Sequence, residues 1–180
     1  MDKNELWVFG YGSLLWHPGF DHDEAVIATL SGYHRSFCMR SIHHRGTDEH
    51  PGLVLALDEG DATCQGIAFR VTPGTEAPTM AALRERELVS SAYLEKTLTL
   101  SLKDGRNVTA VTYVIDPEHV QYCHLQLEEQ AQIIATAVGG RGPNTDYLFN
   151  TADHLTDLGI TDPELSWLAN RVREIAPNAT

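Results

Sequence analysis

Two glycines and a serine follow the first apolar run of the chain, and their types and spacing suit the binding of an anion. The segment consists of Gly10, Tyr11, Gly12, Ser13, Leu14 and Leu15, and is called the 10–15 turn below. Glycine tolerates positive φ and leaves one wall of a turn without side chains, so backbone N–H groups can point into a concavity. Such groups can hold a carboxylate or a developing oxyanion, to which the Ser13 hydroxyl could add a contact. The same pattern also fits a tight turn that binds nothing.

The spacing within the 10–15 turn differs from three known motifs. Its order, Gly-x-Gly-Ser, is not the Gly-x-Ser-x-Gly elbow that presents a nucleophilic serine. No Gly-Lys-Ser/Thr follows it, as in a phosphate-binding P-loop, and the third glycine of the dinucleotide fingerprint is missing. A serine hydrolase that uses Ser13 is an alternative, although the sequence shows no well-placed His–Asp partnership for it.

A second candidate is a glutamate on a helix predicted over residues 77–91. At 100° per residue, Glu87 lies about 20° from Met80 and about 40° from Leu83 around the helix axis. Glu85 points to roughly the opposite side. We therefore expect the Glu87 carboxylate on the apolar face, where partial desolvation raises its pKa toward neutral pH, as a general acid/base requires. The alternative is a glutamate at the helix margin that pairs with a neighbouring arginine.

The elements that must position these residues are strands in the first part of the chain and helices after residue 122. Strands are predicted over residues 5–11, 26–42, 52–57, 64–71, 93–102 and 108–115. Charged turns after residues 57 and 102 predict two hairpins. Asn144 and the run Thr161-Asp162-Pro163-Glu164 are expected to cap later helices. The pattern predicts a single α+β domain over residues 1–180 with a barrel-like sheet.

The composition favours a small-molecule substrate over a nucleic acid or a membrane. The 180 residues carry a net charge of −12, which opposes non-specific binding to polyanions. No run approaches about 18 consecutive apolar residues and no secretory signal is recognisable, so we expect a cytoplasmic protein. The three cysteines form no C-x-x-C pair, and the adjacent His43 and His44 would point to opposite faces of a strand. We therefore expect no disulfide and no metal site.

Together with their neighbours, the 10–15 turn and Glu87 resemble the ChaC family of glutathione-specific γ-glutamylcyclotransferases. The matching segments, in family order, are WVFGYGSLLWHPGF at 7–20, GYHRSFCMRSIHHRGT at 32–47, PGLVLAL at 51–57, RELVSSAY at 86–93 and GPNTDYLFNTADHLTDLGITDPELSWL at 142–168. The resemblance implies a γ-glutamylcyclotransferase-like fold, in which helices flank a small barrel-like mixed β-sheet with a cavity at one end. It also implies a cofactor-independent lyase that releases 5-oxoproline and Cys-Gly from glutathione.

The resemblance further implies roles for particular residues. The 10–15 turn corresponds to the segment that binds the γ-glutamyl group, and Glu87, in an Arg-Glu pair shortly before Tyr93, corresponds to the catalytic glutamate. Family members often have glycines before this tyrosine, where the present chain has Ser90-Ser91-Ala92. This difference affects the expected substrate more than the expected type of reaction, because Glu87 itself is unchanged.

Arg40, Tyr113 and Tyr147 are further candidates to line the cavity. The alternative is that Arg40 forms a salt bridge and that both tyrosines pack in the core. Two other functions also fit the sequence: a cyclotransferase for other γ-glutamyl amines or γ-glutamyl amino acids, and a non-catalytic regulatory protein on the same scaffold.

Overall fold

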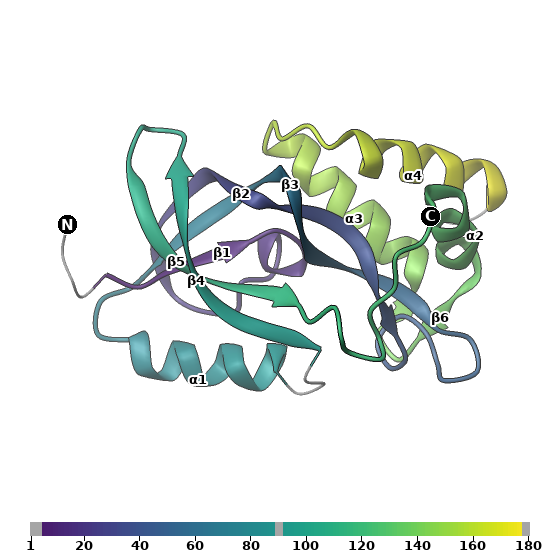
Figure 1. Cartoon of the computed structure of the whole chain (residues 1–180), viewed down its shortest axis with the longest axis horizontal. Helices are drawn as coiled ribbons and strands as arrows, with labels where there is room; N and C mark the ends of the chain where they lie inside the picture. Colours follow the sequence, from purple (N-terminus) through teal and green to yellow (C-terminus); the bar gives the residue numbers. More distant parts are fainter. Residues whose placement is uncertain (1–4, 89–91, 178–180) are drawn as a thin grey trace. The chain divides into compact units, whose positions relative to one another are not determined.

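The computed structural model describes residues 5–88 and 92–177, and the chain divides into two compact units. The first unit is drawn from the residues up to Arg35 and from Leu57–His119. The second is drawn from Ser36–Ala56 and from the residues after His119. The fold is α+β with a closed barrel, as the sequence predicts (Figure 1).

The barrel has the strand order β1-β3-β2-β4-β5. Its strands are β1 (Trp7–Gly10), β2 (His22–Ser41), β3 (Gly52–Val71), β4 (Tyr93–Leu102) and β5 (Asn107–Ile115). The short strand β1 is antiparallel to β3, with Gly10 opposite Ile67, and parallel to β5, with Val8 opposite Val111. The strand that leads into the 10–15 turn is thus held on both edges.

One of the two predicted hairpins is correct and the other is wrong. β4 and β5 pair from Tyr93 opposite Ile115 to Ser101 opposite Asn107, as expected. The predicted strands over residues 52–57 and 64–71 are instead one continuous strand of 20 residues, β3. Its charged middle, expected to be a turn, lies largely exposed and stays in the strand, because β3 runs beside the equally long β2. Solvent exposure, not a change of direction, explains the charges there.

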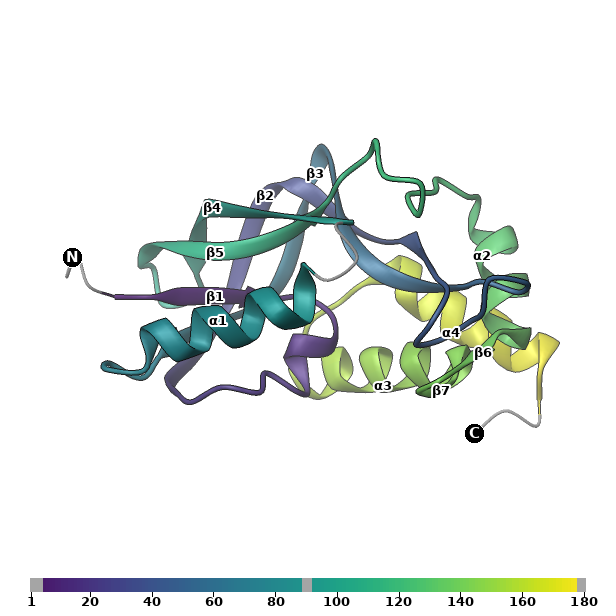
Figure 2. The same cartoon turned by 90° about the horizontal axis from the view of Figure 1, so that it is seen from below.

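The helix of the first unit, α1 (Glu76–Glu87), lies along β1 in both views (Figures 1 and 2). It is shorter than the predicted range, which continues to residue 91, and residues 89–91 lie outside the described part of the chain. Leu83 of α1 is buried in an apolar cluster with Val8, Val71 and Val111 from three strands. This cluster fixes α1 on the barrel, because burying one large aliphatic side chain contributes about 1.5–3 kcal/mol.

The second unit contains α2 (Leu127–Thr136), α3 (Asn144–Asp157) and α4 (Pro163–Ile175), with the short strands β6 (Val138–Gly139) and β7 (Gly142–Pro143). Asp162 caps α4 as predicted, since its carboxylate accepts from the Leu165 N–H at 3.1 Å. Asn144 does not cap α3, whose N-cap is Pro143. Its side chain accepts from Leu53 N at 2.7 Å and donates to Leu53 O at 2.8 Å, so it pairs with β3 like a neighbouring strand. Across the described residues, no helix combines the length and apolarity that a membrane span needs.

Candidate functional site

The 10–15 turn leaves β1 at Gly10 and forms a short 3-10 helix, η1 (Ser13–Leu15). The expectation that its glycines provide positive φ is wrong: Gly12 has a φ of −137°, and Gly10 is a paired residue of β1. Space is what Gly10 provides. A Cβ there would lie 3.0 Å from Phe69 Cε2 and 3.1 Å from Leu14 Cβ. The absence of a side chain therefore allows the turn to pack against β3.

A buried arginine that the sequence analysis did not select anchors the turn. Arg35 of β2 has only 4% exposure, and its Nε donates to the Tyr11 carbonyl at 2.8 Å. Its Nη2 donates to the carbonyl of Gln65 in β3. The signal was present, because Tyr33, Arg35 and Phe37 are alternate residues of one strand and all three are buried.

Several residues of the turn serve the fold. Leu14 belongs to the apolar cluster beneath α1, and Leu15 is buried as well. The Tyr11 hydroxyl donates to the Tyr113 carbonyl of β5 at 3.0 Å. Ser13 is only partly buried, and its hydroxyl accepts a hydrogen bond from Arg86, the residue that precedes Glu87.

Glu87 is the last residue of α1 and has the environment that the helix geometry predicts. Its side chain is only 14% exposed, whereas Glu85 is exposed. Burial raises the pKa of Glu87, and the positive charge of Arg86 opposes that rise. The alternative of an arginine partner also holds in part, because Glu87 Oε1 lies 3.5 Å from Arg86 Nε.

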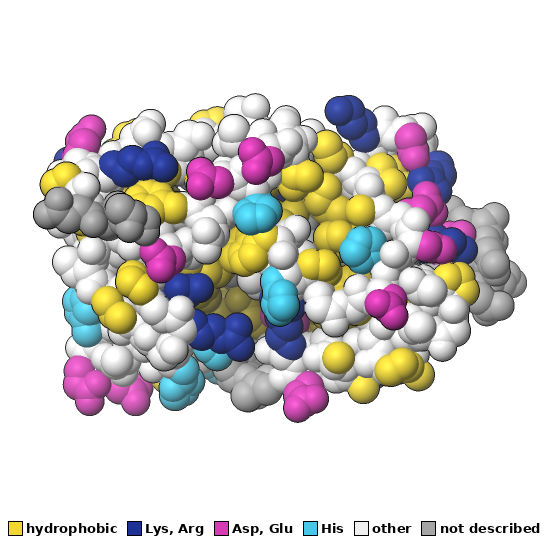
Figure 3. All heavy atoms as spheres, turned by 180° about the vertical axis from the view of Figure 1, so that it is seen from behind, with side chains coloured by type: hydrophobic (Ala, Val, Ile, Leu, Met, Phe, Trp, Pro, Cys, Tyr) yellow, Lys and Arg dark blue, Asp and Glu magenta, His cyan; other side chains and the backbone are white. Residues whose placement is uncertain are grey.

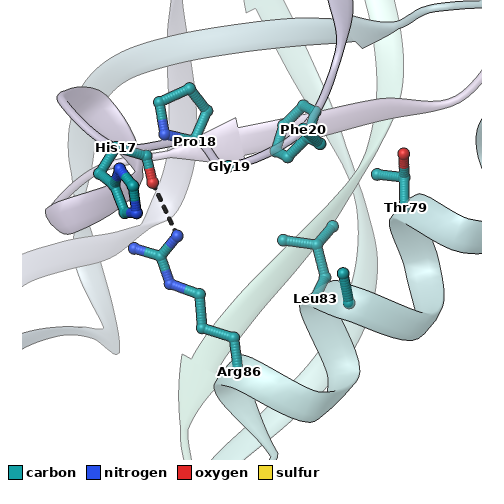
Figure 4. Close-up of a pocket in the computed structure, with 8 residues that line it drawn as sticks. His17, Pro18, Gly19, Phe20, Thr79, Leu83 and Arg86 are labelled. Carbon is teal, nitrogen blue, oxygen red and sulfur yellow. Dashed lines mark hydrogen bonds between the residues drawn. The ribbon is translucent and has the colours of Figure 1, made fainter.

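Arg86 connects the helix that carries Glu87 to the 10–15 turn. Its Nη2 donates to Ser13 Oγ at 2.9 Å, and its Nη1 donates to the His17 carbonyl at 2.7 Å (Figure 4). A guanidinium keeps its proton in proteins and cannot serve as a general base. The group that the structure places on Ser13 Oγ therefore does not activate it as a nucleophile, which counts against the serine hydrolase.

Tyr113 lies beneath α1 and is buried, as the alternative interpretation of this residue expects. Its hydroxyl donates to Glu95 Oε1 at 2.9 Å, and Arg84 donates to both oxygens of Glu95, at 3.0 and 3.1 Å. Burial raises the pKa of Tyr113, and the charges of Glu95 and Glu87 raise it further. Tyr113 is thus a neutral hydroxyl within electrostatic reach of the Glu87 carboxylate, and its direct partner Glu95 was not identified from the sequence.

A cavity of about 210 Å³ opens between α1 and the segment that follows the turn (Figure 4). It is lined by His17, Pro18, Gly19, Phe20, Thr79, Ala82, Leu83 and Arg86. Neither Glu87 nor any residue of the 10–15 turn lines it. Arg86 is therefore the lining residue that connects this cavity to the turn, through its hydrogen bond to Ser13.

Arg40 and Tyr147 belong to the second unit, where each has partners of its own. The Arg40 backbone pairs with Gln121, and the charge of Arg40 opposes the rise in the pKa of the Cys123 thiol that burial causes. The Tyr147 hydroxyl accepts from Leu55 N at 3.1 Å, and its ring packs edge-on against Phe37. Tyr147 thus packs in a core, as its alternative interpretation expects.

No metal centre is identified among the described side chains. Within residues 5–88 and 92–177, no group of three or more His, Cys, Asp and Glu side chains is placed to hold a metal ion. On the face drawn in Figure 3, acidic and basic side chains are interspersed with apolar ones. The first unit brings together the Glu87 carboxylate, whose pKa is raised, the Arg86 guanidinium and the 10–15 turn.

Comparisons with known proteins identify the family of the chain. A family model described as ChaC-like protein matches residues 6–175. The glutathione-specific γ-glutamylcyclotransferase of Escherichia coli is 38% identical over 175 residues, which cover 97% of this chain and 75% of the relative. The human glutathione-specific γ-glutamylcyclotransferase 1 is 32% identical over 98% of this chain and 82% of its own length. A crystal structure of the yeast γ-glutamyl cyclotransferase specific to glutathione matches with a TM-score of 0.86 at 21% identity, over 96% of this chain and 97% of that one.

Proposed function

The chain belongs to the ChaC-like family, and on this premise we propose that it is a cytoplasmic, glutathione-specific γ-glutamylcyclotransferase. The observation that carries the proposal is the partly buried Glu87, whose pKa is raised and whose neighbour Arg86 is bonded to the 10–15 turn. The relatives from E. coli and human are named for this activity. We also propose that residues 1–180 form one functional domain, since a single family model spans both units.

The reaction is an intramolecular transfer that needs no second substrate. The α-amine nitrogen of the γ-glutamyl group attacks its own γ-carbonyl carbon, and the amide C–N bond to the cysteine breaks. The α-ammonium gives up one proton before the attack and a second as the lactam forms. Glu87 accepts each of them in turn and passes them to the leaving nitrogen, so 5-oxoproline and Cys-Gly with a protonated amine are released. Effective molarities on the order of 10⁵ M are available to such an attack if the chain is held folded back on itself.

Glu87 suits both proton transfers because its raised pKa lies closer to neutral pH than that of an exposed glutamate. The backbone N–H groups of the 10–15 turn hold the γ-glutamyl carboxylate or the oxyanion that forms at the γ-carbon. The loss of one oxyanion donor typically costs about 10²–10³-fold in turnover. Tyr113, a neutral hydroxyl whose pKa responds to the charge of Glu87, is proposed to line this site.

The test compares Glu87→Gln with Glu85→Gln, the same substitution on the exposed side of α1. Release of 5-oxoproline from glutathione is expected to fall by about 10²–10⁴-fold in the first variant, because a general acid/base is removed. The second variant should behave like the wild type. Near wild-type turnover by Glu87→Gln would sink the assignment.

The same assay with γ-glutamyl-alanine separates the alternatives. Product from glutathione alone supports the proposed specificity, and product from both substrates supports a cyclotransferase of broader range. Ser90 and Ser91, where the chain departs from the family, lie outside the described residues. Their effect on substrate choice therefore remains a prediction for this panel.

A further inference from the structure

The three guanidinium nitrogens of Arg86 lie close to three different residues: Ser13, His17 and Glu87. We propose that Arg86 is a positioning residue, which fixes the 10–15 turn and the Glu87 carboxylate relative to each other; this inference rests on the proposed function. Arg86 is not assigned a proton-transfer role, since its guanidinium stays charged.

The contacts use the shape of the side chain. Nη2 reaches Ser13 Oγ at 2.9 Å, Nη1 reaches the His17 carbonyl at 2.7 Å, and Nε lies 3.5 Å from Glu87 Oε1. The guanidinium is planar and rigid, so fixing two of its nitrogens also fixes the third. A lysine ammonium, a single point on a flexible stem, cannot hold all three groups in one geometry.

The two oxygens that Arg86 binds belong to Ser13 and His17, which lie on either side of residues 14–16. Ser13 begins η1, and His17 follows it and donates its N–H to the Ser13 carbonyl at 2.9 Å. Arg86 therefore holds residues 13–17 at two points, which include the last part of the 10–15 turn and the segment that follows it. Glu87 needs such a tie, because it is the final residue of α1 and helix ends fray.

The charge of Arg86 provides a readout that a purely structural contact would not move. Among the described residues, the groups that act electrostatically with Glu87 are Arg86 on its own helix and Tyr113 from β5, whose hydroxyl is bonded to Glu95 of β4. Among these, Arg86 lowers the pKa of Glu87 against the effect of burial. Removing this charge in Arg86→Gln should raise the pKa of Glu87. Arg86→Lys retains the charge but loses the planar guanidinium that contacts three groups at once.

The experiment measures 5-oxoproline release from glutathione between pH 5 and pH 9 for the wild type, Arg86→Lys, Arg86→Gln and Lys103→Gln. Lys103 is an exposed cation on the β4–β5 turn, so its variant controls for the loss of one positive charge. We expect kcat to fall by about 10²-fold in both Arg86 variants, the usual cost of misplacing reacting groups by about 1 Å. The acid limb of the pH profile should move to higher pH in Arg86→Gln only.

Ser13→Ala, alone and combined with Arg86→Gln, identifies the route. If Arg86 acts through Ser13, the double variant loses less than the product of the two single losses, because both remove one contact. Thermal unfolding of each variant gives the folded fraction, to which kcat is normalised.

The outcomes separate the two proposals. A wild type that releases 5-oxoproline, with Arg86 variants whose normalised kcat and pH profile are unchanged, overturns the positioning role alone. A wild type that releases no 5-oxoproline from glutathione or γ-glutamyl-alanine overturns the proposed function, and the role of Arg86 with it.

Discussion

Replacing Arg35 with leucine tests how the barrel holds the 10–15 turn. The substitution removes two hydrogen bonds from a buried cation, to the carbonyls of Tyr11 and Gln65. Hydrogen bonds to charged groups contribute about 1.5–3 kcal/mol each, so the gross loss is about 3–6 kcal/mol. A leucine that packs in the vacated space returns up to about 2 kcal/mol. We therefore expect the free energy of unfolding to fall by about 1–4 kcal/mol.

Urea unfolding followed by circular dichroism measures this loss. Arg141→Leu is the matched control: Arg141 is exposed, and the unfolding midpoint of its variant should shift little. Arg35→Lys keeps the charge and can hold only one of the two carbonyls well, so its midpoint should lie between those of wild type and Arg35→Leu. Release of 5-oxoproline, measured well below the midpoint, should fall in Arg35→Leu because the turn loses its anchor.

Two results would contradict this reasoning. An unfolding free energy within about 0.5 kcal/mol of wild type would show that the two carbonyls find other partners. A destabilised Arg35→Leu with normal turnover would show that the anchor serves the barrel and not the turn.

Two further predictions concern stability. Burial raises the pKa of Glu87, so this carboxyl favours folding below its ordinary pKa and loses that contribution as pH rises through the raised value. Urea titrations between pH 4 and pH 8 should therefore show Glu87→Gln gaining stability over wild type as the pH rises, by about 1.4 kcal/mol for each tenfold difference in proton affinity between the folded and unfolded chains. A stability difference that does not change with pH would refute this. Asn144→Ala leaves the N–H and carbonyl of Leu53 unpaired, at about 1–3 kcal/mol each, whereas Asn150→Ala, on the exposed side of α3, should unfold at the wild-type midpoint.

Local periodicity explains which features the sequence predicts correctly. Glu87 was separated from Glu85 because an α-helix repeats every 3.6 residues, and Leu83 places the apolar side of α1. The β4–β5 hairpin was predicted because its charged turn reverses the chain, with Gly105 at a φ of +97°. The charges in the middle of β3 look the same in the sequence but only mark exposed strand. Local patterns cannot separate the two cases, since the difference lies in the long partner strand β2.

Arg35 and Arg86 show which contacts can be predicted from local sequence patterns and which cannot. Arg40 was selected from β2 and Arg35 was not, although the alternation of buried residues in β2 favours Arg35. The anchoring role of Arg35 could be predicted from the sequence, because period two is a local signal. The contact between Arg86 and Ser13 is different: 73 residues separate them, and only the packing of α1 on the barrel brings them together. Residue types can therefore identify a turn and a proton carrier separately. The contact that holds the turn and Glu87 in place relative to each other forms only when α1 packs on the barrel, and the Arg86 and Ser13 variants test this contact directly.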